Sequence, residues 1–347
     1  MKIGIVNDLP MVAEALRRAV LLQPGYQVIW IARDGAEAVA QCARDRPDII
    51  LMDLIMPGMN GIEATRRIMA ETPCAILVVT VNVGVNASAV FDAMKYGALD
   101  AVDTPDLGSR DPHAGAAALL AKLGCIARQI GTGTEMLRTI QLPTGSLPSR
   151  TEKHLVAIGA SAGGPGAIAK LLGALPREFP ASIIIIQHID VQFSAGLAEW
   201  LSRQSVHSVR LAEAGDQPAI GTVLLARGNE HLRLTTTAEL TYTSEPGDCA
   251  YRPSIDVFFQ SVCQFWPHDA TGVLLTGMGR DGAAGLKSLR DKGYHTIAQD
   301  EASSTVYGMP KAAARLDAAD EILPLEQIAP SLAAIVFPSD RSRAVRR

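Results

Sequence analysis

The sequence predicts an α/β protein built from two doubly wound parallel-sheet domains. Its 347 residues are enough for about two domains of ordinary size. In each half, short apolar runs of strand length alternate with stretches of helical periodicity, the pattern of parallel strands joined by crossover helices. Hydrophobic residues make up 48% of the chain and charged residues 20%, so each half can bury a core and general disorder is excluded.

The first domain is predicted to span residues 1–124 and to contain a five-stranded sheet. The apolar runs that indicate strands lie at residues 3–6, 28–31, 49–52, 76–79 and 99–102. Helical patterns separate them at residues 12–22, 36–44, 61–70 and 90–96. Sheets of this kind bind ligands at the carboxyl ends of their strands, so we expect functional residues there.

A change of composition separates the two domains. Glycine and proline interrupt the periodicity of residues 125–152, which we interpret as a linker that partly packs against a domain. A second alternation then predicts a domain over residues 153–340. Its predicted strands lie at residues 155–158, 183–186, 223–226 and 273–276, and its clearest helices at residues 167–172 and 283–291.

Charge, cysteine content and hydropathy exclude several classes of protein. The net charge of -4 provides no basic field that would hold nucleic acid. The cysteines are too scattered for a disulfide framework or a thiolate zinc site, and we expect small buried thiols: Cys42, Cys74, Cys125, Cys249 and Cys263. No apolar run reaches about 18 residues and no signal peptide precedes the first strand, so we expect a cytoplasmic protein without membrane insertion.

Two aspartates follow neighbouring strands of the first domain. Asp8 comes after the strand at residues 3–6 and Asp53 after the strand at residues 49–52, so a parallel sheet would bring the two carboxylates together. A divalent cation such as Mg2+ would relieve their repulsion, and the hydroxyl of Thr80 could hydrogen-bond an oxyanion on Asp53. This combination predicts a phosphorylation switch. The alternative is that the aspartates only cap the helices that follow them.

These residues give the first domain a resemblance to the receiver domain of bacterial response regulators. The resemblance covers residues 1–122 and includes the proline- and glycine-containing turn after Asp53. It implies a flavodoxin-like fold in which Asp53 accepts phosphate from a sensor histidine kinase. It also implies that Mg2+ is held by Asp8, Asp53 and the backbone carbonyl of Ile55.

Two positions depart from the usual pattern of receiver domains. Asn7 stands where a second acidic residue is usual, which removes one negative charge from the metal site. Thr104 stands where a lysine is usual, so it supplies no ammonium to pair with the phosphoryl group. Lys95 lies inside a helical pattern, and we expect it to be a solvated side chain.

A serine lies in a glycine-rich turn between a strand and a helix of the second domain. Small residues flank Ser161 in the spacing G-x-S-x-G, and they leave its hydroxyl exposed beside backbone N–H groups of a helix N-terminus. The turn alone leaves three interpretations open: a nucleophile, a dinucleotide-binding loop or a purely structural turn. No acidic residue closes the next strand, as nucleotide binding would require. That strand ends instead in Gln187 and His188.

His188 and Asp281 favour the nucleophile. His188 ends a strand on the same sheet edge as Ser161, and Asp281 lies in a glycine-rich turn after the strand at residues 273–276. A carboxylate there can hold the histidine tautomer and stabilise the imidazolium that forms when the serine proton is taken. The order Ser, His, Asp along the chain does not predict the α/β-hydrolase fold. The other histidines are interpreted as turn or surface residues without a role: His113, His154, His207, His231, His268 and His295.

From end to end, the chain resembles the CheB family of chemotaxis-type methylesterases. The resemblance rests on residues 159–165, 187–188, 251–256, 275–282, 299–303 and 307–310. It implies a Rossmann-like catalytic domain that hydrolyses γ-glutamyl methyl esters on the cytoplasmic domain of a methyl-accepting receptor, and some relatives also deamidate receptor glutamine. Residues 5–10 and 104–105 resemble most the surface-sensing, Wsp-type branch, in which the pathway controls a diguanylate cyclase.

The same resemblance implies a role for each residue of the esterase site. Ser161 is the nucleophile, His188 the general base and then acid, and Asp281 the residue that orients the histidine. Backbone N–H groups of Met278 and Ala162 form the oxyanion hole. No cofactor is expected at the esterase site, and the receiver is expected to cover it until phosphorylation. The alternative function is a non-catalytic module that binds a receptor in response to phosphorylation.

Overall fold

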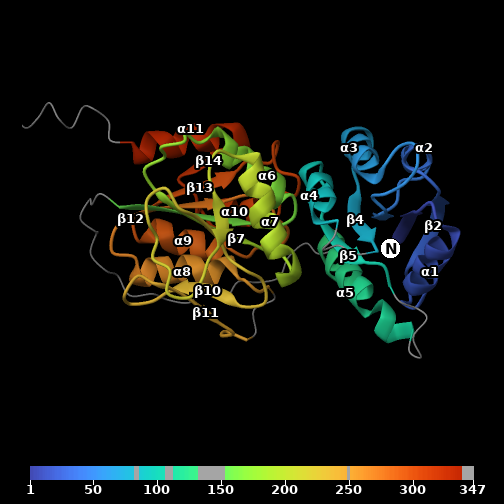
Figure 1. The fold of residues 1–347 in the computed structure, drawn as a ribbon, viewed down its shortest axis with the longest axis horizontal. Helices are drawn as coiled ribbons and strands as arrows, with labels where there is room; N and C mark the ends of the chain where they lie inside the picture. Colours follow the sequence, from blue (N-terminus) through green and yellow to red (C-terminus); the bar gives the residue numbers. More distant parts are fainter. Residues whose placement is uncertain (82–85, 106–111, 132–152, 248–250, 338–347) are drawn as a thin grey trace, which may run out of the picture. The chain divides into compact units, whose positions relative to one another are not determined.

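A computed structural model describes residues 1–81, 86–105, 112–131, 153–247 and 251–337 of the chain. The chain divides into two compact units, Met1–Arg138 and Thr139–Arg347 (Figure 1). Each unit contains a parallel sheet with helices on both faces, so the predicted class of two doubly wound α/β domains is confirmed. Within these described ranges, no helix is long and apolar enough to cross a membrane.

The first unit has a five-stranded parallel sheet in the order β2-β1-β3-β4-β5. The strands are β1 (Lys2–Val6), β2 (Gln27–Ala32), β3 (Ile49–Met52), β4 (Ala75–Thr80) and β5 (Asp100–Asp103). One face is covered by α1 (Pro10–Leu21) and α5 (Pro112–Gly131), and the other by α2 (Gly35–Arg44), α3 (Gly61–Glu71) and α4 (Ala87–Lys95). The strand order reverses between β1 and β3, and ligands bind at such a reversal.

The second unit has a seven-stranded parallel sheet in the order β14-β13-β12-β6-β7-β9-β8. The strands are β6 (His154–Ala160), β7 (Ser182–Gln187), β8 (Val209–Leu211), β9 (Val223–Leu225), β12 (Asp269–Leu274), β13 (His295–Gln299) and β14 (Glu321–Leu323). One face is covered by α6 (Gly164–Ala174), α7 (Val191–Gln204) and α11 (Leu325–Val336), and the other by α8 (Ile255–Phe265), α9 (Ala283–Asp291) and α10 (Met309–Arg315). A hairpin of β10 (His231–Leu234) and β11 (Leu240–Thr243) packs on α8.

Three central strands of the second unit, β12, β6 and β7, lie side by side. Ile158 of β6 pairs with Val273 of β12 and with Ile185 of β7. All three of these side chains are buried, because helices cover both faces of the sheet. The segments that follow the three strands therefore leave the sheet at the same edge.

Some predicted boundaries were wrong, for local reasons. α6 begins at Gly164 instead of residue 167, because Gly163 adopts a left-handed φ of 75° at the cap and Pro165 fits the first turn. α5 continues to Gly131, into the segment expected to be a linker, and residues 132–152 of that segment lie outside the described residues. The sequence pattern predicts neither the β10–β11 hairpin nor the short strands β8 and β14, which are too short for a clear period.

Candidate functional site

The residues of the predicted triad follow three adjacent strands. Ser161 comes directly after β6, and its N–H donates a hydrogen bond of 3.1 Å to the carbonyl of Thr276, just beyond β12. His188 comes directly after β7, and its N–H donates to the carbonyl of Ala160 over 3.0 Å. These backbone bonds extend the sheet by one residue and hold the serine and the histidine at neighbouring positions.

Close packing requires small residues around Ser161. A Cβ atom on Gly277 would lie 2.8 Å from the Cβ of Ser161, and one on Gly164 would lie 2.0 Å from the side-chain oxygen of Gln187. The N-cap residue of α6 is Gly163, so no side chain caps the first turn of this helix. The hydroxyl of Ser161 is therefore not used as a helix cap, which is the usual structural reason for a serine at this position.

His188 and Asp281 form a buried pair. Nε2 of His188 lies 2.7 Å from Oδ2 of Asp281, and their side chains are only 7% and 11% exposed. An ionised carboxylate can only accept, so Nε2 carries a proton, and in the neutral ring the lone pair is then on Nδ1. Nδ1 is buried and has no hydrogen-bond partner, so no bond joins it to Ser161 in this structure. Such contacts are often long in enzymes without substrate.

Asp281 is kept ionised by His188 and by donors at the N-terminus of α8. Its carboxylate accepts hydrogen bonds from the hydroxyl of Ser254 (2.8 Å) and from the N–H groups of Ile255 (2.7 Å) and Asp256 (3.2 Å). Burial alone would raise the pKa of Asp281, but the His188 ring and these donors outweigh it and hold the pKa below its ordinary value. The positive end of the α8 dipole acts in the same direction.

A second carboxyl group, the partly buried Asp256, lies next to Asp281, and the sequence analysis gave it no role of its own. Its Oδ1 accepts the N–H of Gly285 over 2.6 Å, at the start of α9. Burial, and then the negative charge of Asp281, raise the pKa of Asp256 to about 7. The two neighbouring carboxyls therefore differ in charge near neutral pH, with Asp281 ionised and Asp256 partly protonated.

Tyr251 and Gln187 support the pair, and sequence reasoning assigned neither a role. The ring of Tyr251 stacks on that of His188, with centroids 4.3 Å apart and planes 7° apart. Nε2 of Gln187 donates to the carbonyls of Ser161 (2.9 Å) and His188 (3.0 Å), so one amide ties the two strand ends together. Tyr251 lies in the stretch 251–256 on which the family resemblance rests, and this membership was the only feature of the sequence that pointed to a role for it.

The interpretation of the remaining histidines as turn or surface residues was wrong for His231. This residue is fully buried in β10, and its Nδ1 accepts the N–H of Ser254 over 3.0 Å. Burial lowers the pKa of His231, which favours the neutral ring that an accepting nitrogen requires. His231 therefore positions the serine that bonds Asp281. His154 and His295 also lie in strands, β6 and β13.

The oxyanion hole is expected to consist of the backbone N–H groups of Ala162 and Met278, which follow the adjacent strands β6 and β12. Ala162 follows Ser161, and Met278 lies in the turn after β12. Neither N–H donates a hydrogen bond to any residue that the structure describes. The carbonyl of Ala162 accepts the hydroxyl of Thr276 over 3.0 Å, which fixes the peptide that joins Ala162 to Gly163. Unused N–H groups beside a nucleophile are what an oxyanion hole requires.

In the first unit, Asp8 and Asp53 follow the adjacent strands β1 and β3. The alternative that they cap helices was wrong: α1 begins after Leu9 without a side-chain cap, and the cap of α3 is Asn60. Burial raises the pKa of Asp53, and the negative charge of Asp8 adds to this, although backbone N–H groups such as that of Ile55 oppose it. The two carboxylates are therefore close enough to repel each other.

Asn7 belongs to the same acidic site. Its Nδ2 donates to Oδ2 of Asp53 over 3.0 Å, and its Oδ1 accepts the N–H of Leu9 over 2.9 Å. The side chain is only 4% exposed, so its orientation is fixed by these bonds. Asn7 thus orients the carboxylate of Asp53 by a hydrogen bond, where a second acid would add charge.

Thr80 and Thr104 lie side by side at the ends of β4 and β5. The N–H of Thr104 donates to the carbonyl of Thr80 over 2.9 Å. The buried hydroxyl of Thr80 accepts Nδ2 of Asn86 over 2.9 Å, and its own proton can still be donated. Lys95, at the end of α4, is exposed, as expected.

Comparison with known proteins decides the family. Residues 156–332 match the family model of the CheB methylesterase, and residues 3–106 match that of the response regulator receiver domain. The chain belongs to the CheB methylesterase family. Its N-terminal unit is a response regulator receiver domain, as the sequence predicted.

Curated relatives of this CheB-family chain match it over almost its whole length. A protein-glutamate methylesterase/protein-glutamine glutaminase of Pseudomonas aeruginosa is 56% identical over 96% of this chain and 99% of the relative. One of Pseudomonas fluorescens is 58% identical over 97% of this chain and 100% of the relative. The solved CheB methylesterase catalytic domain of Thermotoga maritima is 31% identical, covers 55% of this chain and 100% of that chain, and gives a TM-score of 0.50.

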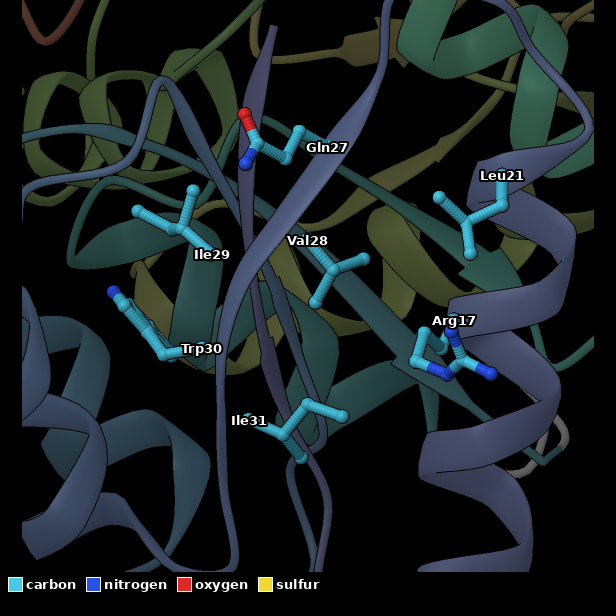
Figure 2. Close-up of a pocket in the computed structure, with 7 residues that line it drawn as sticks. All are labelled: Arg17, Leu21, Gln27, Val28, Ile29, Trp30 and Ile31. Atoms are coloured by element: carbon cyan, nitrogen blue, oxygen red, sulfur yellow. The ribbon is translucent and has the colours of Figure 1, made fainter.

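A pocket on the receiver domain of this CheB-family chain lies apart from both candidate sites. It has a volume of about 230 Å³ and lies between α1 and the edge strand β2 (Figure 2). α1 contributes Arg17 and Leu21, and residues 27–31 of β2 form the rest of the lining. None of these residues belongs to the acidic site or to the predicted triad, so the pocket is not a candidate for either chemistry.

Proposed function

We propose that this CheB-family chain is a phosphorylation-regulated protein-glutamate methylesterase. Its substrate would be a γ-glutamyl methyl ester on the cytoplasmic domain of a methyl-accepting receptor, and its products glutamate and methanol. The observation that carries the proposal is the buried pair of His188 and Asp281, with Nδ1 of His188 unpartnered at the sheet edge where Ser161 lies. The names of the relatives support methyl-ester hydrolysis at protein glutamate and a second activity, deamidation of protein glutamine.

In the proposed mechanism, Ser161 is the nucleophile. Its Oγ attacks the ester carbonyl while Nδ1 of His188 takes the proton, and Asp281 stabilises the imidazolium. The N–H groups of Ala162 and Met278 would bind the oxyanion. Methanol leaves with the proton from His188, and water, activated by the same nitrogen, hydrolyses the glutamyl-enzyme. The chain's own residues supply every group that these steps require.

Methanol release from a methylated receptor cytoplasmic fragment tests this mechanism. Ser161→Ala is expected to lose several orders of magnitude in rate. Ser288→Ala is the matched control, because the Ser288 hydroxyl donates to the carbonyl of Ala284, one turn earlier on α9. Near-normal release by Ser161→Ala would overturn the assignment. Receptor binding without methanol release would support the non-catalytic alternative, and a nucleotide titration would detect the dinucleotide-binding alternative.

In the receiver domain, Asp53 is the proposed phosphoacceptor and a sensor histidine kinase the donor. Asp8, Asp53 and the backbone carbonyl of Ile55 would hold Mg2+. The repulsion by which Asp8 raises the pKa of Asp53 fits a cation site, because a bound cation removes that repulsion. When bound, Mg2+ would neutralise charge on the transferred phosphoryl group. Thr80 would donate its hydroxyl to a phosphoryl oxygen, and Asn7 would orient the acceptor carboxylate.

The receiver domain is proposed to inhibit the esterase until it is phosphorylated. Phosphorylation adds a charge of about -1.5 to -2, which can bias a two-state interface. A fragment beginning near Lys153 is expected to release methanol faster than the full chain, and a small-molecule phosphodonor is expected to activate the full chain. The solved catalytic domain of the Thermotoga maritima relative supports the use of such a fragment. Equal rates for fragment and full chain would exclude inhibition.

The pathway is proposed to be chemotaxis-like, with control of a diguanylate cyclase as its output. Residues 5–10 and 104–105, which resemble the surface-sensing branch, support this output. A receptor cytoplasmic domain as substrate supports a cytoplasmic location. The net charge of -4 supports the expectation that no nucleic acid takes part. Measurement of cyclic diguanylate in cells with and without Ser161→Ala tests the output.

A further inference from the structure

The receiver domain holds a pair of thiols that neither the esterase nor the phosphorylation site uses. Cys42 lies in α2, and Cys74 lies directly before β4, 32 positions further along the chain. Their Sγ atoms are 3.9 Å apart, and either thiol can donate the hydrogen bond between them. Both are free thiols. The sequence contains no CxxC motif that would predict this pair, because the two cysteines are far apart in the chain and meet only in the folded domain.

The surroundings of the two sulfurs differ in a way that suits stepwise oxidation. Cys42 is fully buried, whereas Cys74 is partly exposed, so a small oxidant reaches Cys74 first. The hydroxyl of Thr72 also donates to Sγ of Cys42, over 3.4 Å. Cys42 therefore stands behind Cys74 as a second thiol at a fixed short distance, the arrangement of an attacking and a resolving cysteine.

Electrostatics favour one shared negative charge on this pair. The hydrogen bond from Cys74 lowers the pKa of Cys42 to about 6, and the contact with Thr72 acts in the same direction. The same contact with Cys42, and then burial, raise the pKa of Cys74, because a second ionisation would place two thiolates side by side. The first ionisation of the pair is therefore eased and the second is opposed, and the partial exposure of Cys74 makes its sulfur the one that a small oxidant reaches.

We propose that Cys42 and Cys74 form a redox-responsive dithiol that a small peroxide converts to an intramolecular disulfide. Sγ of Cys74 attacks one peroxide oxygen and the O–O bond breaks, which gives a sulfenic acid and, with the thiol proton, water. Sγ of Cys42 then attacks the Cys74 sulfur, the S–O bond breaks, and the hydroxide leaves as water with the Cys42 proton. Two thiols are oxidised by two electrons, and one peroxide is reduced to two waters.

The disulfide would enclose the segment that carries the phosphoacceptor. Residues 42–74 include β3, Asp53 and α3. A cross-link between α2 and the start of β4 restricts the unfolded chain most strongly in this segment, so oxidation should raise the thermal midpoint of the receiver domain. The site would thus couple the oxidation state of the cell to the rigidity of the phosphorylation segment, independently of the esterase.

The test treats the full chain with hydrogen peroxide and then with dithiothreitol. We expect a mass loss of about 2 Da, a Cys42–Cys74 linked peptide in a non-reducing digest, a raised thermal midpoint, and reversal of all three by the reductant. Cys263 serves as an internal control, because burial raises its pKa to about 12 and it should remain a thiol.

Two variants keep the proposal falsifiable. Cys74→Ser, at the partly exposed position, should form no cross-link and show no rise in midpoint, and Cys42→Ser should behave alike if it folds. Sulfinic or sulfonic acid at Cys74 without a Cys42 link, or cross-links only between chains, would overturn the proposal. Because no readout involves methanol release, this result is independent of the proposed esterase function.

Discussion

Replacement of Asp281 by asparagine tests the electrostatics of the proposed triad. In the parent, Oδ2 of Asp281 accepts Nε2–H of His188, which leaves the lone pair on Nδ1. An asparagine amide can place its NH2 group at the same point and donate to Nε2, which moves the ring proton to Nδ1. The base is then lost while the shape of the site is kept. In Ser-His-Asp enzymes this change costs about 10⁴-fold in rate, or about 5.5 kcal/mol of barrier.

The cost of Asp281→Asn in stability is smaller and has a separate origin. Besides His188, Oδ2 of Asp281 accepts the N–H of Ile255 over 2.7 Å. An NH2 group at that position leaves this buried N–H without an acceptor, at a cost of about 1–3 kcal/mol. For a unit of this size, each kcal/mol lowers the thermal midpoint by about 2–4 °C. We therefore expect a folded variant with almost no activity.

The assay combines methanol release from the methylated receptor fragment with thermal unfolding of the same samples. Asp291→Asn is the matched control, because Asp291 is 61% exposed at the end of α9 and pairs only at the surface with Lys287. The control should keep the parent's rate. If Asp281→Asn retains more than about a tenth of that rate while folded, Asp281 does not orient His188 and the reasoning is refuted.

Three further predictions concern Tyr251, Asp256 and Asp53. Tyr251→Leu removes the ring stacked on His188 and should slow methanol release by about 2- to 10-fold, the value of an aromatic contact, whereas Tyr251→Phe should keep the parent's rate. Burial raises the pKa of Asp256 from 3.8 to about 7, so the native state binds the extra proton and the parent loses stability as the pH rises through this interval. Urea unfolding should therefore show Asp256→Asn gaining stability over the parent from pH 4 to pH 7, and a constant difference would contradict this. Burial also raises the pKa of Asp53, so Asp53→Asn should stabilise the receiver domain more at pH 7 than at pH 4. The same variant should take up no phosphate from a phosphodonor. Labelled phosphate on it would show that another residue is the acceptor.

The strands and the residues at their ends could be predicted because both faces of each sheet are covered. Burial on both faces makes the middle of a strand such as β7, residues 183–186, a continuous apolar run, and the polar residues that follow it, Gln187 and His188, mark the predicted functional edge. The adjacency of Asp8 and Asp53 follows from the same rule, since β1 and β3 are neighbours. Parallel topology alone is therefore enough to predict which residues lie at the two functional edges.

The remaining parts of the site depend on contacts between segments far apart in the chain. His188 and Asp281 are 93 positions apart, and which ring nitrogen meets the carboxylate is set by packing alone. The stacking of Tyr251 and the burial of His231 depend on the β10–β11 hairpin and the loop after it, which carry no clear period. Local sequence patterns cannot predict such contacts, because the contacts form only when the fold brings distant segments together.

The position of the α8 N-terminus explains two glycines near the proposed triad, Gly159 at the end of β6 and Gly282 directly after Asp281. A Cβ atom on Gly159 would lie 2.4 Å from Cγ2 of Ile255, and one on Gly282 would lie 2.7 Å from the same atom. Ile255 thus packs between the end of β6 and the turn after β12, and its own N–H donates to Asp281. The first glycine of the G-x-S-x-G spacing therefore matters for the position of Asp281 as much as for that of Ser161. It admits the side chain that brings the α8 N-terminus, with its N–H donors, against the carboxylate.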